Sequence, residues 1–82
     1  MMLYHLSFVE EAVMNPDYEG YIGGRVEVRT PDSEYAEEEI RFFTNKTYEF
    51  RKFREVWDFE YVNEFMLNRL RHKIEGEYND DV

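Results

Sequence analysis

Hydrophobic and polar residues alternate with a period of two in residues 3–9, 25–30 and 36–42. Strict alternation places one set of side chains on each face of an extended chain, so each stretch is predicted to form a strand with one buried face. The aromatic and branched side chains in these stretches also favour strands. The pattern therefore predicts a small antiparallel sheet. Its apolar side comprises Tyr4, Leu6 and Phe8, then Val26 and Val28, then Ala36, Ile40 and Phe42.

The second and third strands are expected to form a hairpin with residues 31–35 as its loop. Apolar residues must face apolar residues across the hairpin, because a slip of one residue moves every side chain to the other face. Arg29 then faces Glu37, and the two charges are expected to neutralise each other. Glu27 faces Glu39, and this pair is expected to be repulsive. A register shifted by two residues meets the same condition. The favoured register pairs Val26 with Ile40, Val28 with Glu38 and Thr30 with Ala36.

Residues 58–75 have the apolar spacing of an amphipathic helix, which we expect to pack on the sheet. Asp58 suits the N-cap position, and Gly76 is expected to stop the helix. Acids near the start and bases near the end complement the helix dipole. Residues 76–82 are expected to form a frayed tail. The apolar stripe consists of Phe59, Val62, Met66, Leu70 and Ile74, flanked by Phe65 and Leu67.

Residues 47–54 fit two structures. Aromatic and polar residues alternate in the first part of this stretch, so the preferred interpretation is a fourth strand paired with residues 38–44. The spacing of Phe50, Phe53 and Trp57 fits a helix instead. The predicted fold class is therefore α+β, with a sheet of three or four antiparallel strands packed against one C-terminal helix.

Residues 10–24 lose the alternating pattern and are expected to form a long connection with one helical turn near residues 11–14. Gly20, Gly23 and Gly24 are interpreted as turn residues, because the residues around them match neither a phosphate-binding loop nor a dinucleotide-binding fingerprint.

The chain has 82 residues and no cysteine, which predicts a single domain over 1–82 without disulfides or thiolate metal sites. So short a chain buries limited surface, and a homodimer that buries more is expected. No apolar run approaches the roughly 20 residues that span a bilayer. The first residues carry no Lys or Arg ahead of their apolar positions, unlike a signal peptide. A cytoplasmic protein that does not bind membranes is therefore expected.

No group of residues has the pattern of a catalytic or metal site. His5 and His72 are far apart in sequence, and paired carboxylates among residues 37–39 need an enclosing cleft to act as acid and base. We therefore expect no enzyme activity, no metal and no cofactor. Residues 46–54 mix basic and aromatic residues as single-strand-binding proteins do. The preferred interpretation is that these rings belong to the core and that the bases balance neighbouring acids.

Acidic residues give the chain a formal net charge of −9, and residues 27–39 hold six acids against one arginine. Glu37 and Glu39, two apart on a strand, would lie about 6.6–7 Å apart. Glu60 and Glu64, four apart on a helix, would lie about 6 Å apart. Both spacings are close to that of successive DNA phosphates. The predicted partner-binding acidic face comprises Glu27, Asp32, Glu34, Glu37, Glu38, Glu39, Asp58, Glu60 and Glu64.

The chain resembles the small acidic proteins that bacteriophages make to disable host machinery, namely anti-restriction, anti-CRISPR and nucleoid-protein inhibitors. Its small size, lack of cysteine and many aromatic residues carry the resemblance, together with the acidic segments EVRTPDSEYAEEE and DFEYVNE. The group shares no single fold. The resemblance implies stoichiometric inhibition of a DNA-binding host protein, such as the nucleoid protein HU, a CRISPR effector or RNA polymerase. The ten basic residues of this chain depart from the most acidic members.

The hypothesis is therefore an acidic DNA mimic that occupies the basic DNA-binding surface of a host protein and does not itself bind nucleic acid. The alternative is a non-enzymatic protein-interaction module, antitoxin-like or an adaptor, that binds through exposed aromatic residues. Salt separates the two, because charge-driven binding weakens steeply as salt rises.

Overall fold

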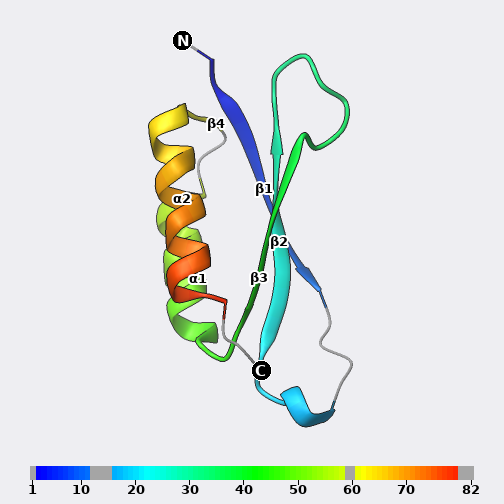
Figure 1. Ribbon diagram of the computed structural model, residues 1–82, viewed down its shortest axis with the longest axis vertical. Helices are drawn as coiled ribbons and strands as arrows, with labels where there is room; N and C mark the ends of the chain where they lie inside the picture. The colour runs from blue at the N-terminus through cyan, green and yellow to red at the C-terminus, as the bar shows by residue number, and fades with distance from the viewer. Residues whose placement is uncertain (1, 12–15, 59–60, 80–82) are drawn as a thin grey trace.

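Two helices cover one face of a four-stranded antiparallel sheet in the computed structural model, which describes residues 2–11, 16–58 and 61–79 (Figure 1). The sheet order is β3-β2-β1-β4. This arrangement confirms the predicted α+β class and the packing of the C-terminal helix on the sheet. The elements are β1 (Tyr4–Glu11), the 3-10 turn η1 (Pro16–Tyr18), β2 (Ile22–Arg29), β3 (Glu38–Thr44), α1 (Thr47–Trp57), β4 (Tyr61–Val62) and α2 (Glu64–Glu77).

The predicted hairpin register is confirmed for two of its three pairs, because Val26 faces Ile40 and Val28 faces Glu38. The third predicted pair, Thr30 with Ala36, lies outside the strands, since β2 ends at Arg29 and β3 begins at Glu38. Strand β1 pairs antiparallel with the other side of β2, which places Leu6 opposite Val28. Buried and half-buried residues alternate along β2 without interruption. Period-two patterning in the sequence thus becomes one apolar face, which the helices cover, and one charged face, which they leave open.

Residues 47–54 form a helix, so the preferred interpretation as a strand was wrong. In α1 the side chains of Phe50, Phe53 and Trp57 all point into the core, as their spacing of three and four residues requires. Phe50 is 1% exposed and stacks on Phe42 of the sheet, with 4.0 Å between ring centroids. A strand would have divided these three rings between two faces. The burial of all three favours the helix.

The C-terminal helix α2 begins at Glu64 rather than at residue 58. The side chain of Asn63 caps it by accepting a hydrogen bond from the Met66 N–H at 2.9 Å. Asp58, the predicted N-cap, instead follows the last residue of α1. Val62, predicted on the helical stripe, lies in β4 and faces Tyr4 across the sheet. Phe59, also predicted on that stripe, lies outside the described residues.

Residues 76–79 belong to the fold rather than to the frayed tail predicted for 76–82, and residues 80–82 of that prediction lie outside the described residues. Gly76 lies within the last turn of α2 rather than beyond its end. Tyr78 is buried, and its carbonyl accepts a hydrogen bond from the Phe43 N–H at 3.0 Å. Asn79 forms a parallel bridge with Phe43. The chain thus adds a short extended piece beside β3 after α2 ends.

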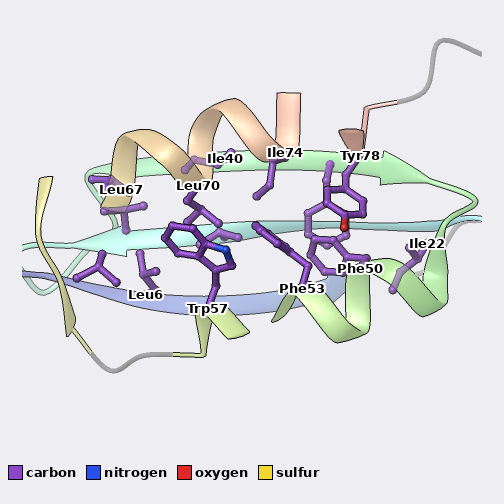
Figure 2. Packing of buried hydrophobic residues seen from close by; sticks show 14 residues of the cluster. Leu6, Ile22, Ile40, Phe50, Phe53, Trp57, Leu67, Leu70, Ile74 and Tyr78 are labelled. Carbon is purple, nitrogen blue, oxygen red and sulfur yellow. The ribbon is translucent and has the colours of Figure 1, made fainter. Parts of the chain in front are cut away.

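One cluster of buried side chains joins the sheet to both helices, as Figure 2 shows. Trp57 and Phe53 of α1 lie near Leu70 and Ile74 of α2. The cluster comprises Leu6, Ile22, Val26, Val28, Ile40, Phe42, Phe50, Phe53, Trp57, Val62, Leu67, Leu70, Ile74 and Tyr78.

Two of the three glycines interpreted as turn residues, Gly23 and Gly24, belong to β2. Gly20 alone adopts a turn conformation, with φ of +87°. A Cβ on Gly24 would lie 2.3 Å from the Val9 carbonyl oxygen and 2.7 Å from the Phe42 ring. Gly24 therefore allows Phe42 to pack closely on the sheet. The helical turn predicted near residues 11–14 falls mostly on 12–15, outside the described residues.

Candidate functional site

The open face of the sheet carries alternating arginines and glutamates that neutralise one another. Glu27 accepts from both neighbouring arginines of β2: the Arg25 Nη2 lies 2.9 Å from Glu27 Oε2, and the Arg29 Nη2 lies 2.7 Å from Glu27 Oε1. The hydrogen bond from Arg25 holds the pKa of Glu27 below its usual value. The Glu27 side chain is only 14% exposed. Glu27 is therefore poorly placed to bind a partner.

Glu39 faces Glu27 across the hairpin, as predicted, but arginines offset the expected repulsion. The Arg41 Nη2 lies 3.1 Å from Glu39 Oε2, and the Arg25 Nε lies 3.7 Å from Glu39 Oε1. Arg25 also binds Glu11 of β1. Three arginines and three glutamates thus form one balanced network across β1, β2 and β3.

The predicted neutralisation of Arg29 by Glu37 was wrong. Arg29 uses its guanidinium for Glu27 and for the Glu34 carbonyl oxygen, to which its Nη1 donates at 2.6 Å. The Glu37 carboxylate accepts instead from the Thr30 hydroxyl at 3.0 Å. No ion pair involves Glu37 among the described residues, so its charge stays available.

Glu38 lies on the helix side of the sheet and joins β3 to α2. Both of its oxygens accept hydrogen bonds from the Arg71 guanidinium, the Nε–Oε2 distance being 2.7 Å. These bonds lower the pKa of Glu38 and raise that of Arg71. Two-pronged arginine–carboxylate pairs are strong and directional. Glu38 is therefore a structural residue rather than part of a binding face.

Four of the predicted acids gather at one end of the molecule, which we call the acidic end: Asp32, Glu34, Glu37 and Glu64. The first three belong to the loop between β2 and β3, and Figure 1 shows this loop at the same end as the start of α2. All four side chains are exposed. None forms an ion pair with another described residue. Asp58 is exposed after α1, and Glu60 lies outside the described residues.

Apolar residues accompany the carboxylates at this end. Tyr35, at the tip of the hairpin loop, is 79% exposed, and Met2 is 57% exposed. Charge counting does not identify either residue, although the apolar run before the first strand was a signal for Met2. A hollow at this end is lined by Met2, Leu3, Tyr4, Thr30, Pro31, Asp32 and Glu37.

The residues that mix bases and rings in 46–54 are divided by the fold. Phe50 and Phe53 are buried, as the preferred interpretation expected, so neither ring can stack on a nucleic-acid base. His5 packs against Tyr61 with ring centroids 5.8 Å apart. Within the described ranges, no three His, Cys, Asp or Glu side chains come together as metal ligands.

No helix in the described part of the chain is long and apolar enough to cross a membrane. Comparison of the chain with models of protein families, with curated proteins and with solved structures found no match. Charge, exposure and packing are therefore the grounds for assigning a function. The cytoplasmic location and the homodimer stay predictions.

Proposed function

We propose that this protein is a non-enzymatic acidic inhibitor that uses its acidic end to occupy the basic DNA-binding surface of a host protein. One observation carries the proposal. The carboxylates of the sheet face form ion pairs with arginines, whereas Asp32, Glu34, Glu37 and Glu64 form no ion pair among the described residues. A basic partner can form with these carboxylates the ion pairs that the described part of the chain does not.

The chemistry of such binding follows from the counterions around each surface. A basic groove that binds DNA releases ions when phosphates enter it, and carboxylates at similar positions gain from the same release. The net charge of −9 also speeds encounter with a basic surface at low salt. Tyr35 beside the carboxylates supplies the kind of exposed ring that anchors many interfaces.

Three acids of the predicted acidic face, Glu27, Glu38 and Glu39, are not part of the proposed contact. The row of Glu37 and Glu39 is not a pair of equivalent phosphate mimics, because Glu39 binds Arg41 and Arg25. Glu27 and Glu38 are held in the same way. The proposed contact is therefore a small acidic tip with a tyrosine, rather than a long track of carboxylates along the sheet.

Displacement of fluorescent DNA from purified HU, RNA polymerase and a CRISPR effector tests the proposal directly. The chain is expected to release DNA from at least one of them, with an effect that falls steeply between about 50 and 300 mM salt. Asp32→Asn, Glu34→Gln and Glu37→Gln together should weaken displacement at least about tenfold.

The matched control removes the same charge elsewhere, at the exposed residues Glu19, Glu55 and Glu75, each replaced by Gln. This triple variant should displace DNA nearly as well as the unchanged protein. An equal loss in both triple variants would show that only net charge matters. Failure to displace DNA from any of the three proteins at low salt would contradict inhibition of these targets.

Exposed aromatic residues favour the second candidate, an interaction module that binds through rings. Tyr48 is 79% exposed and Phe65 is 70% exposed, and both lie on the helices rather than in the hairpin loop. Binding of this kind would persist at high salt and survive the loss of Asp32 and Glu34. Tyr48→Ala or Phe65→Ala would then weaken it, whereas the acidic inhibitor should tolerate both changes.

A further inference from the structure

The cations of this protein are unevenly paired. Acids outnumber bases by 19 to 10, and most bases lie against a carboxylate. Lys46 donates to the Glu77 carbonyl oxygen. Arg51, Lys52 and Arg69 have no such partner in the described part of the chain, and all three are exposed on the helices. The paired bases are Arg25, Arg29, Arg41, Arg54, Arg71 and Lys73.

Two of these three cations line one groove between α1 and α2. Lys52 and Arg69 form its rim together with Lys73, and the groove has a volume of about 500 Å³. Phe53 and Trp57 line its floor. The helices are antiparallel, since the start of α1 meets the end of α2 where the Tyr78 hydroxyl donates to the Glu49 carbonyl oxygen. A groove between two antiparallel helices has the shape that a third helix fills.

Apolar side chains are exposed beside the cations. Val56 lines the groove and is 60% exposed. A second hollow over the outer side of α2 shares Arg69 and Lys73 with the groove and adds Phe65 and His72. The helix layer therefore presents the exposed apolar residues Val56 and Phe65 near two cations without an ion pair in the described chain, Lys52 and Arg69.

We propose that the groove between α1 and α2 docks an acidic amphipathic helix of a partner protein. The partner's apolar side chains would cover Val56 and Phe65, and its carboxylates would pair with Lys52 and Arg69. Helix-in-groove binding requires such a combination of apolar anchors and flanking charge. Charge complementarity favours an acidic partner, because Lys52 and Arg69 form no ion pair in the described part of the chain. The third cation of the lining, Lys73, is already paired with Glu77, and Glu49 is the other acid of the lining.

Nucleic acid fits this surface less well than an acidic helix. A phosphate chain has no apolar side chain for Val56 or Phe65, and the buried rings of the floor cannot stack on bases. The net charge of −9 repels any polyanion at long range. A protein helix offsets that repulsion through apolar burial. Its binding should therefore depend only weakly on salt, unlike binding at the acidic end.

Selection from a display library tests the proposal. Random segments of about 16 residues, roughly four helical turns, are selected on the full chain at physiological salt. Sequences that place Asp or Glu and Leu, Phe or Met at helical spacing are expected to be enriched. The fluorescence of Trp57, the one tryptophan in the sequence, reports their binding as synthetic peptides because its ring lines the groove.

Adjacent residues of α1 provide a matched pair of variants. Lys52→Glu with Arg69→Glu should weaken the selected peptides about tenfold. Arg51→Glu is the matched control for Lys52→Glu alone: it reverses one charge one residue away, outside the groove lining, and should change affinity less than about twofold. Lys52→Gln with Arg69→Gln gives a milder version if the reversed charges disturb folding, which thermal unfolding of each variant checks.

Several results would overturn the proposal. Enrichment of only basic sequences would place binding at the acidic end, and no enrichment would show that the groove docks no helix. Equal losses in Lys52→Glu and Arg51→Glu would mean that the groove is not the site. Displacement of the acidic peptides by a short single-stranded DNA would assign the surface to polyanions in general.

Discussion

Gly24 occupies a position where the sheet has no room for a side chain. Gly24→Ala would place a Cβ within 2.7 Å of the Phe42 ring and closer still to the Val9 carbonyl oxygen. Overpacking of this kind typically costs about 1–3 kcal/mol, and we expect urea unfolding to show a loss in that range.

Gly76→Ala is the matched control for this change. Nothing lies within 4 Å of a Cβ at Gly76, in the last turn of α2. Alanine favours helix over glycine by about 0.5–1 kcal/mol, so this variant should be more stable than the unchanged protein. A Gly24→Ala variant as stable as the unchanged protein would contradict the close packing of the sheet at Gly24.

The ion pair between Glu38 and Arg71 makes stability depend on pH. Because Arg71 lowers the pKa of Glu38 in the folded protein, the pair stabilises the fold above the pKa of the unfolded chain, about 4.3. This stabilisation is lost as the pH falls through the pKa that Glu38 has in the folded protein. Glu38→Gln should therefore cost about 1 kcal/mol at pH 7 and less at pH 3, as measured by urea unfolding at each pH.

Glu37→Gln removes the same charge from the neighbouring residue, which has no arginine partner in the described chain. We expect it to change stability by less than about 0.5 kcal/mol at either pH. A pH profile that is equally altered by both variants would mean that general charge, and not the pair with Arg71, sets the acid response.

Helix α2 depends on a cap that lies five residues after the one that the sequence suggests. Asn63 satisfies the Met66 N–H, which would otherwise have no partner within the helix. Asn63→Ala should therefore lower stability by about 1 kcal/mol and reduce the helical circular dichroism signal. Asp58→Ala should change stability and the circular dichroism signal by little. A larger effect of Asp58→Ala than of Asn63→Ala would indicate that the helix begins after Asp58, as the sequence pattern predicts.

Element boundaries show where sequence patterns stop being informative. The hairpin register was predictable because alternation leaves few ways to bury Val26, Val28 and Ile40 together. The start of α2 was not, because Val62 has helical spacing from Met66 and yet serves as a strand residue at the sheet edge. The sequence left residues 47–54 undecided between strand and helix, because so short a stretch fits both the strand period and the helix period. The burial of both Phe53 and Trp57 favours the helix.

The whole molecule is expected to unfold in one step, because a single core joins the sheet to both helices. Trp57 fluorescence reports the helix layer and far-ultraviolet circular dichroism reports the whole chain. The two signals should change at the same urea concentration. Phe50→Ala should lower the free energy of unfolding by about 3–5 kcal/mol, because Phe50 packs on Phe42 and Tyr78. Both signals should report the same loss. An earlier change in Trp57 alone would show that the helices unfold separately.

At this scale the sequence predicted the amount of charge but not its distribution. Which acids are free depends on residues that the chain brings together from afar, such as Arg71 for Glu38 and Arg54 for Glu10. A count over residues 27–39 treats all six acids alike. The fold divides them into held carboxylates and the few that remain at the acidic end.

The last described residues have a consequence for how the protein behaves in a crowded cell. Strand β3 forms one border of the sheet, and there the Phe43 N–H donates to the Tyr78 carbonyl oxygen while the Asn79 amide donates to the Arg41 carbonyl oxygen. An unprotected border is a template on which a foreign strand can add, the first step towards fibrils. In this protein Tyr78 and Asn79 cover part of the exposed edge of β3. If Tyr78 left that edge, we expect aggregation to begin at β3.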